Sequence, residues 1–237
     1  MESIQIDELN ISIKRSSRRK TVGITVNRDG SVCVAAPEDC EREQIDQYVK
    51  SKTLWIYQKL GQRELISSKE VPAKEYVDGS SFWYLGRTYR LVVCDEMPEE
   101  AHGSPLFLCG ERFLLDRGSI GNARECFRRW YVDFGRPIVD RLIEQLSNRI
   151  SIPSKVDIRD IGFRWGSCTK EGKVLISWRS IQLPIDALEY VVAHEMVHLL
   201  HRNHDKDFWH QLQKVMPDYR ERKDWLAING EKFAADF

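Results

Sequence analysis

Apolar and polar residues alternate along the N-terminal half of the chain, and this pattern predicts β-hairpins. The segment KTVGITVNRDGSVCVAAP alternates on both sides of Asp29-Gly30, a dipeptide suited to a tight turn. SFWYLGRTYRLVV and PLFLCGERFLLD each place a glycine between two strand-like runs, at Leu85-Gly86 and at Cys109-Gly110. Between the first hairpin and the other two, residues from about 41 to 66 predict a long amphipathic helix, because apolar residues recur at near-helical spacing at Ile45, Val49, Ile56 and Leu60.

The second half of the chain predicts helices around one further pair of strands. A helical region runs from about residue 120 to 150, and we expect Gly135 and Pro137 to kink or divide it. In KVDIRDIGFRWGSCTKEGKVLISWRSIQLP, two strand runs flank a glycine-bearing connection that ends at Glu171-Gly172. The next helix begins after Pro184, with Asp186 as the expected N-cap.

These elements predict an α+β fold in two regions. Residues 1–118 form a β-rich N-terminal region with one long helix, and residues 119–237 form a helical region that carries the candidate chemistry. The two regions are short enough to pack as a single domain.

The amino-acid composition limits the kinds of partner that we expect the protein to bind. The chain has 237 residues with 36 Lys plus Arg and 36 Asp plus Glu, so there is no overall basic field to hold nucleic acid. The basic clusters KRSSRRK and RECFRRW are charge runs of the kind that usually lie on solvated faces. We find no signal-peptide pattern and no run long enough to span a membrane, and we expect a cytoplasmic protein. The six cysteines form no CxxC pair, which argues against a cysteine zinc site.

Five of the six histidines lie between residues 194 and 210, within and after the segment VVAHEMVHLLHRNHDKDFW. His194 and His198 are four residues apart, so on a helix both imidazoles leave one face about 6 Å apart along the axis. Two such side chains can bind one metal ion, while Glu195 can take a proton from a water there. The same HExxH pattern also occurs by chance on amphipathic helices. Here the surrounding residues are apolar, and buried polar groups are costly unless something binds them.

A third ligand is needed, and two histidines compete for the role. On a straight helix His201 lies about 7.5 Å along the axis beyond the midpoint of His194 and His198. His204 follows Asn203, a residue type that ends helices in the left-handed conformation, so the chain can fold back there. We therefore assign the metal ligands as His194, His198 and His204, with a fourth position open to water.

The remaining polar residues near this segment receive other roles. Asp205 and Asp207 are the acidic alternatives for the third ligand, and both are also suited to cap the next helix. We expect His201 and His210 to lie outside the ligand set.

The segment RWGSC precedes the histidine helix and has a chemistry of its own. Arg164 can clamp a carboxylate or a phosphate in a planar fork, and Gly166 allows close approach. Trp165 and Cys168 are equally consistent with a stacking wall and with structural packing beside the helix. We predict Glu195 and Arg164 as the catalytic side chains.

Several motifs together resemble the YgjP-like family of metal-dependent hydrolases, which is related to SprT-like and other zincin metallopeptidases. The motifs are HEMVHLLHRNHDKDFW, RWGSC, ISWR and MPDY, with RRKTVGITVNRDGSVCVAAP and KTLWI in the N-terminal half. The resemblance implies a zincin-like core with zinc on the three assigned histidines and Glu195 as the general base. It also implies two substrate classes, because the family is linked both to peptidases and to pyrophosphatase activity on UTP.

Three functional classes follow. The first is a zinc peptidase, in which a strand such as KVLISW offers its edge to an extended peptide. The second is a nucleoside triphosphate pyrophosphohydrolase that uses the same centre, aided by arginines and by another divalent ion. The third is a non-catalytic module with structural zinc, against which Glu195 argues. We rank the peptidase first and hold UTP cleavage as the alternative.

Overall fold

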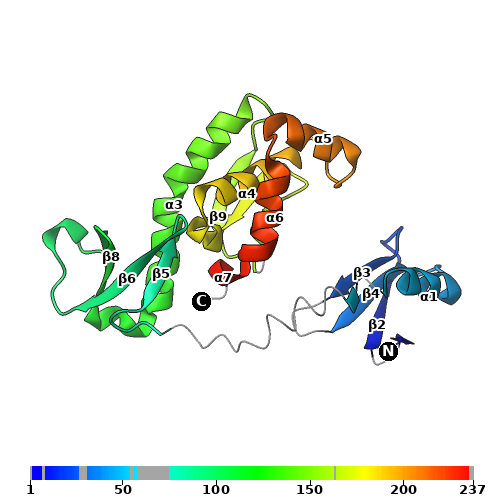
Figure 1. The fold of residues 1–237 in the computed structure, drawn as a ribbon, viewed down its shortest axis with the longest axis horizontal. Coiled ribbons are helices and arrows are strands. Elements are labelled where there is room, and N and C mark those ends of the chain that lie inside the picture. Colours follow the sequence, from blue (N-terminus) through cyan, green and yellow to red (C-terminus); the bar gives the residue numbers. More distant parts are fainter. Residues whose placement is uncertain are drawn as a thin grey trace. The chain divides into compact units, whose positions relative to one another are not determined.

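The structure is a computed structural model of the chain, and it describes residues 2–6, 9–26, 31–53, 56–57, 75–162 and 164–234. The chain divides into two compact units, Met1–Val71 and Pro72–Phe237 (Figure 1). The expected boundary at residue 118 lies inside the second unit. Strands on the N-terminal side of residue 118 share one hydrophobic core with helices on its C-terminal side, as the contacts of Phe113 with Phe127 and Trp130 illustrate.

The first unit is a four-stranded sheet with one helix. The strands are β1 (Ser3–Ile6), β2 (Leu9–Ser16), β3 (Gly23–Val26) and β4 (Val32–Pro37), in the order β1-β2-β4-β3. β3 and β4 are antiparallel, which confirms the predicted hairpin strands, and the turn at Asp29-Gly30 lies outside the described residues. The alternation follows from burial, because every second residue of β4 enters the core of this unit.

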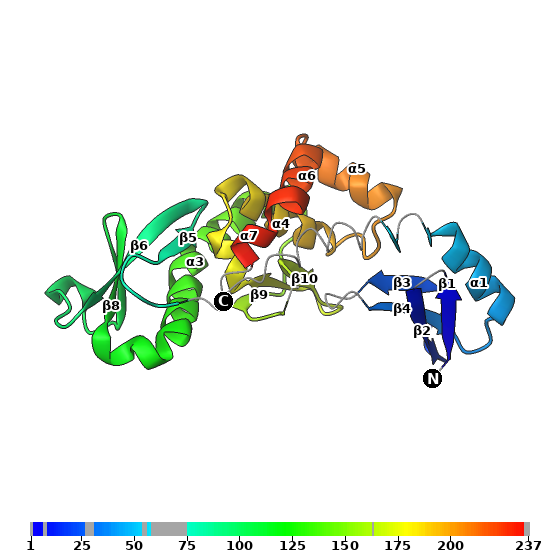
Figure 2. The same ribbon diagram turned by 60° about the horizontal axis from the view of Figure 1, so that its bottom comes forward.

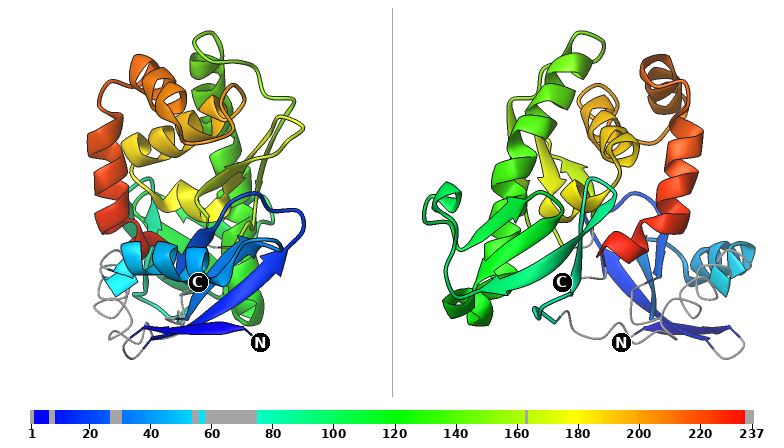
Figure 3. Two further views of the ribbon diagram at one scale, coloured as in Figure 1. Left: turned by 90° about the vertical axis from the view of Figure 1, so that its right-hand side faces the viewer. Right: turned by 60° about the vertical axis from the view of Figure 1, so that its left-hand side comes forward.

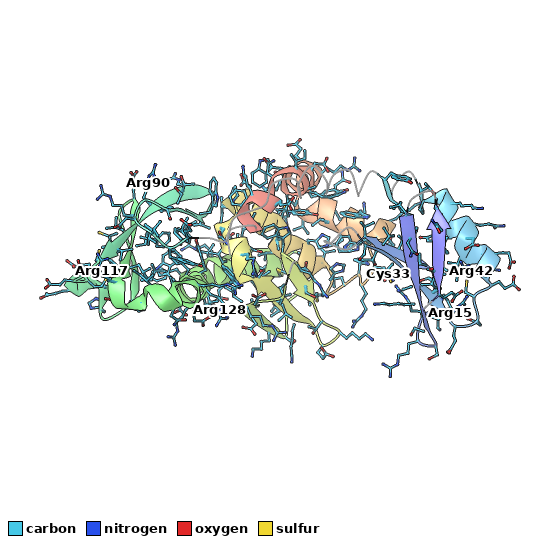
Figure 4. All side chains as sticks on the ribbon, turned by 90° about the horizontal axis from the view of Figure 1, so that it is seen from below. Arg15, Cys33, Arg42, Arg90, Arg117 and Arg128 are labelled. Carbon is cyan, nitrogen blue, oxygen red and sulfur yellow. The ribbon has the colours of Figure 1, made fainter. Side chains whose placement is uncertain are left out.

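Helix α1 (Arg42–Ser51) covers the start of the predicted long helix, with Ile45 and Val49 buried. Most of the rest of that prediction, including Leu60, lies outside the described residues. Glu2 accepts hydrogen bonds from Arg15 of β2 and Arg42 of α1, which lie close together (Figure 4). These two guanidinium groups lower the pKa of the Glu2 carboxyl.

The second unit contains a four-stranded sheet made of the two other predicted hairpins. Its strands, in the order β5-β6-β8-β7, are β5 (Ser81–Tyr84), β6 (Arg87–Cys94), β7 (Leu106–Cys109) and β8 (Arg112–Asp116). β5 pairs with β6 and β7 pairs with β8, both antiparallel, so both hairpin predictions are confirmed. Leu85 and Gly86 both have positive φ, 48° and 78°, as a two-residue hairpin turn requires.

The short 3-10 segment η1 (Glu99–Ala101) lies between β6 and β7. A second one, η2 (Arg117–Asn122), leads from β8 into a single helix, α3 (Ala123–Ser147). The expectation that this region divides is wrong, because α3 continues through Pro137, and the alternative of a kink stays a prediction. Gly135 has a packing role instead, since a Cβ there would lie 2.6 Å from the side chain of Ile181. Of the helices in the described residues, none is both long and apolar enough to cross a membrane.

A small mixed sheet and four more helices complete the unit. They are β9 (Lys155–Arg159), β10 (Gly166–Cys168), β11 (Lys173–Ser177), η3 (Trp178–Gln182), α4 (Ile185–Val197), α5 (Lys206–Val215), α6 (Tyr219–Asn229) and α7 (Glu231–Ala234). The sheet order is β10-β11-β9, and β10 is a strand that the sequence pattern did not predict.

Helix α4 is the central element of this unit. It packs against β10 and β11 of the small sheet (Figure 2) and lies between α3 and α6, which are green and red in the right panel of Figure 3. Its N-cap is Pro184 without a side-chain hydrogen bond, so the expectation that Asp186 caps the helix is wrong. Asp186 lies in the first turn, where its charge still favours the helix dipole. The overall fold is α+β, as predicted.

Candidate metal centre

The buried helix α4 carries His194 and Glu195, and His198 is its C-cap residue. Nine of its residues are buried, including the apolar residues that flank the histidines. Because His194 and His198 are one turn apart, their ring centroids lie 5.0 Å apart. The tight packing of α4 on its neighbours holds both rings on a rigid element.

The chain brings His204 back to this pair through an early end to the helix. α4 ends at Val197, whose carbonyl accepts hydrogen bonds from the backbone N–H groups of Leu200 and His201. The expected role of Asn203 is wrong, because among the described residues only Leu85 and His102 are non-glycine residues with positive φ. The helix ends earlier than predicted, and the extra loop length gives the chain room to turn.

Three imidazoles converge at this point. His194, His198 and His204 each offer a ring nitrogen, and these atoms all lie within 4.8 Å of one another. The Nε2 atoms of His194 and His204 are 2.8 Å apart. Two nitrogens that share a tetrahedral zinc ion lie about 3.3 Å apart, given a Zn–N distance of about 2.0–2.1 Å. For this pair a shift of about half an ångström suffices, and three imidazole nitrogens are a donor set that fits zinc.

Neighbouring groups set which nitrogen of each ring faces the centre. Nδ1 of His198 lies 2.9 Å from the carbonyl oxygen of His201, which leaves Nε2 for a metal. Nδ1 of His194 lies 3.5 Å from the Tyr190 hydroxyl. The His201 side chain stands outside the ligand cluster, and this residue contributes its carbonyl group instead.

Burial lowers the pKa of His194 to about 3, and the nearby His204, His198 and Lys223 act in the same direction. This imidazole is therefore neutral at neutral pH, and a neutral ring nitrogen is the form that binds a metal ion.

Helix α5 packs against all three histidine rings through Phe208. Phe208 is fully buried, and its ring centroid lies 4.9, 4.6 and 4.7 Å from those of His194, His198 and His204. Asp205 is the N-cap of α5 and accepts a hydrogen bond from the backbone N–H of Phe208 at 3.0 Å. Asp205 thus serves as a helix cap, and neither Asp205 nor Asp207 belongs to the histidine cluster.

Trp209 contacts His204 through a hydrogen bond and through its ring. Its indole Nε1–H donates to the carbonyl of His204 at 3.1 Å, and the two rings stack with centroids 5.7 Å apart. Sequence reasoning missed Phe208 and Trp209 as site residues. Their only signal was their place directly after His204 and the helix cap.

Trp209→Phe is expected to weaken zinc binding about tenfold, because it removes the hydrogen bond that orients the His204 segment while keeping an aromatic ring. Competition with a coloured zinc chelator measures the affinity. The matched control is Trp225→Phe, which makes the same change on α6 against Phe233. Equal zinc affinity in the Trp209 variant and the unmodified protein would contradict the positioning role.

Glu195 lies against the edge strand β10. It is 8% exposed, and its carboxylate accepts a hydrogen bond from the backbone N–H of Cys168. Burial raises the pKa of the Glu195 carboxyl to about 7, while the positive charge of Arg164 and the Cys168 hydrogen bond oppose that shift. A Cβ on Gly166 would lie 2.5 Å from Cγ of Glu195, so only glycine leaves room for this side chain.

Gly166→Ala is expected to lower the free energy of unfolding by about 1–3 kcal/mol, the usual cost of overpacking, and to displace the Glu195 carboxylate. We expect hydrolytic turnover to fall because the carboxylate is displaced, while the zinc content stays unchanged. Thermal melts, metal analysis and activity assays measure these effects. Gly121→Ala is the control, because a Cβ at Gly121 meets no atom within 4 Å. A fully active Gly166→Ala variant would remove the steric argument.

The other residues of RWGSC have different surroundings. Arg164 is exposed, and its Nη1 lies 3.5 Å from Oγ of Ser167. Trp165 is half-buried against the core, and its carbonyl accepts hydrogen bonds from the Ser177 N–H and the Ser180 hydroxyl. Cys168 contributes its backbone N–H, and burial raises the pKa of its thiol.

Comparison with known proteins places the chain in a family. The family model of the YgjP-like proteins, described as a metallopeptidase domain, matches residues 20–229. The chain belongs to the YgjP-like family. Among curated proteins, none matches the chain significantly. Among solved structures, the metallopeptidase zymogen of Pyrococcus abyssi abylysin is similar, with 24% identity over 37% of this chain and 90% of that one and a TM-score of 0.34. A structural likeness this low carries no weight for activity.

Family membership and site geometry agree on the general class of chemistry. The family is one of metallopeptidases, which implies a divalent metal ion, typically zinc, and the three converging histidines are a donor set of that kind. The predicted class of metal-dependent, peptidase-like hydrolase is therefore supported.

Proposed function

We propose that the protein is a zinc-dependent peptidase, with His194, His198 and His204 as ligands and Glu195 as the general base. The observation that carries the proposal is the convergence of three imidazole nitrogens within 4.8 Å. Glu195, which directly follows His194 in the chain, is 8% exposed. A closed structural zinc site has no use for a buried carboxyl group beside its ligand pair.

The chain's own groups supply the acid–base steps. When bound, zinc lowers the pKa of a water molecule and polarises the carbonyl group under attack. The pKa of Glu195, raised to about 7, suits a group that accepts a proton and then returns it to the leaving amine. The Cys168 N–H and Arg164 hold the charged form of Glu195 in place, and Gly166 provides the space in which it sits.

The small sheet offers an edge for an extended peptide, although not on the predicted strand. β11, which contains KVLIS, is the central strand, so an edge role for it is wrong. β10 is at the edge, and among the described residues it pairs only with β11. Backbone groups of Gly166 and Cys168 point away from β11, as the Cys168 N–H to Glu195 contact illustrates. A peptide added along β10 would pass beside Glu195.

The alternative substrate is a nucleoside triphosphate such as UTP, and two candidate phosphate partners are already engaged. Arg179 donates to Asp160 at 3.2 Å and lies 4.5 Å over the ring of Trp178. Arg128, within the basic cluster of α3, forms an ion pair with Glu125. An arginine held by a carboxylate is a poor phosphate ligand, so Arg179 and Arg128 give the nucleotide alternative no support.

One set of assays tests the proposal. Metal analysis of the purified full chain comes first, followed by incubation with unfolded casein and with a panel of nucleoside triphosphates, each with and without a chelator. Chelator-sensitive casein cleavage is expected. Chelator-sensitive cleavage of one triphosphate with no proteolysis would replace the peptidase by a pyrophosphohydrolase, and bound metal without either activity would make the centre structural.

A further inference from the structure

A groove between α5 and α6 opens directly beside the metal centre. Its volume is about 510 Å³, and both helices contribute to its walls. Its aromatic lining consists of Trp209 from α5 and Tyr219 from α6, whose rings stack with centroids 5.6 Å apart. Figure 3 shows the two helices, orange and red, following one another around α4.

The aromatic lining connects the groove to the candidate ligands. Trp209 stacks both on His204 and on Tyr219. The groove therefore begins one ring away from a histidine of the centre. Because an extended peptide rises about 3.3 Å per residue, a chain cleaved at the centre would reach this groove within about two or three residues.

The groove is lined by more cations than anions. Lys206, Arg220 and Lys223 line it, together with one acidic side chain, Asp224. The ammonium of Lys223 lies 5.0 Å from the centre of the Trp209 ring, and Arg220 lies over Tyr219. Among the described residues, no carboxylate forms an ion pair with any of these three cations. The charges of Lys223 and Arg220 lie against aromatic faces, Arg220 also donates a hydrogen bond to the Tyr219 hydroxyl at 3.1 Å, and none of the three cations is neutralised by a carboxylate.

The opposite side of α6 provides a contrast. A second groove there, of about 330 Å³, contains Arg222, whose guanidinium is close to three carboxylates. It forms ion pairs with Glu189, Asp218 and Asp186. That arginine is already paired and joins α4 to α6, in contrast to the cations of the groove next to the centre.

We propose that this groove, lined by Lys206, Trp209, Tyr219, Arg220 and Lys223, is a substrate subsite that binds the side-chain carboxylate of an Asp or Glu residue of the peptide. The proposal rests on the proposed peptidase function and adds its sequence preference. Unpaired cations beside a metal centre favour substrates that present negative charge within a few residues of the scissile bond. The apolar ring faces accommodate the methylene groups of such a side chain.

The test uses binding, so that it does not depend on turnover. The probes are fluorescein-labelled, end-blocked ten-residue peptides of alanine and serine that differ only in one Glu, Gln or Lys. Anisotropy titrations with the full-length Glu195→Gln chain and added zinc measure the dissociation constants. We expect the Glu peptide to bind about fivefold more tightly than the Gln peptide, the scale of one exposed charge interaction, and the Lys peptide to bind most weakly.

Matched variants assign the preference to the groove. Lys206→Gln with Lys223→Gln removes two groove cations, whereas Lys155→Gln with Lys214→Gln removes two exposed lysines outside it. The Glu preference should vanish in the first double variant and persist in the second. Equal binding of the Glu and Gln peptides by the unmodified groove overturns the proposal, and so does a preference that survives loss of Lys206 and Lys223.

Two further outcomes separate the causes of failure. If peptides are cleaved without any Glu preference, the subsite is wrong while the peptidase function stands. If no peptide is cleaved but the Glu preference depends on the groove lysines, the subsite stands while the peptidase function fails. Inorganic tripolyphosphate is the competing probe. Its binding through Lys206 and Lys223, with no discrimination between the Glu and Gln peptides, would make the groove a phosphate site and overturn the proposal.

Discussion

Glu195→Gln is expected to retain zinc and to lose turnover by about two to four orders of magnitude, the usual contribution of a positioned general base. Glutamine has nearly the same shape as glutamate, so it can occupy the space over Gly166 without the clash that a larger group would cause. Its amide cannot take up a proton. Elemental analysis and hydrolysis assays on the same preparation measure the two halves of the prediction.

The matched control is Glu144→Gln, the same change on an exposed position of α3. It should leave both zinc content and turnover unaltered. Loss of zinc from the Glu195 variant would make Glu195 a ligand, and undiminished turnover would exclude it from the reaction.

The second prediction with a large expected effect distinguishes the roles of His204 and His201. His204→Ala is expected to weaken zinc binding by at least about a hundredfold, since the free energy of binding, roughly 10–16 kcal/mol for structural zinc sites, is shared among a few ligands. His201→Ala should leave zinc affinity nearly unchanged, because that residue acts on His198 through its backbone carbonyl. Titration against a zinc indicator measures both affinities.

Thermal melts of the zinc-free variants accompany these titrations, because a variant that unfolds would lose metal for an unrelated reason. The result that would contradict the assignment is the reverse order, with His201→Ala losing zinc and His204→Ala retaining it. In that case the loop after α4 would have to deliver a different imidazole to the centre.

The parts of the protein that depend on local periodicity could be predicted from the sequence. Alternation and turn residues located all three hairpins, because strand pairing and turn geometry are set by residues close in the chain. The HExxH spacing placed His194 and His198 on one helix face, with Glu195 directly after the first of them, for the same reason. The choice of His204 over His201 also followed from helix geometry, although the expected helix-ending role of Asn203 was wrong.

The tertiary structure decided everything that depends on contacts between distant segments. Pro137 lies within one continuous helix, because burying a face of α3 outweighs the loss of one backbone hydrogen bond, and Gly135 is required by Ile181, far along the chain. Likewise, the need for glycine at residue 166 arises from the Glu195 side chain packed on it, and Phe208 supports three imidazoles that come from two segments. The charge of the groove could not be predicted from the sequence either. The chain has 36 basic and 36 acidic residues, and this balanced total does not indicate which cations lack an ion-pair partner. Sequence patterns report interactions between near neighbours along the chain, whereas steric fit and charge pairing depend on which surfaces meet once the chain has folded.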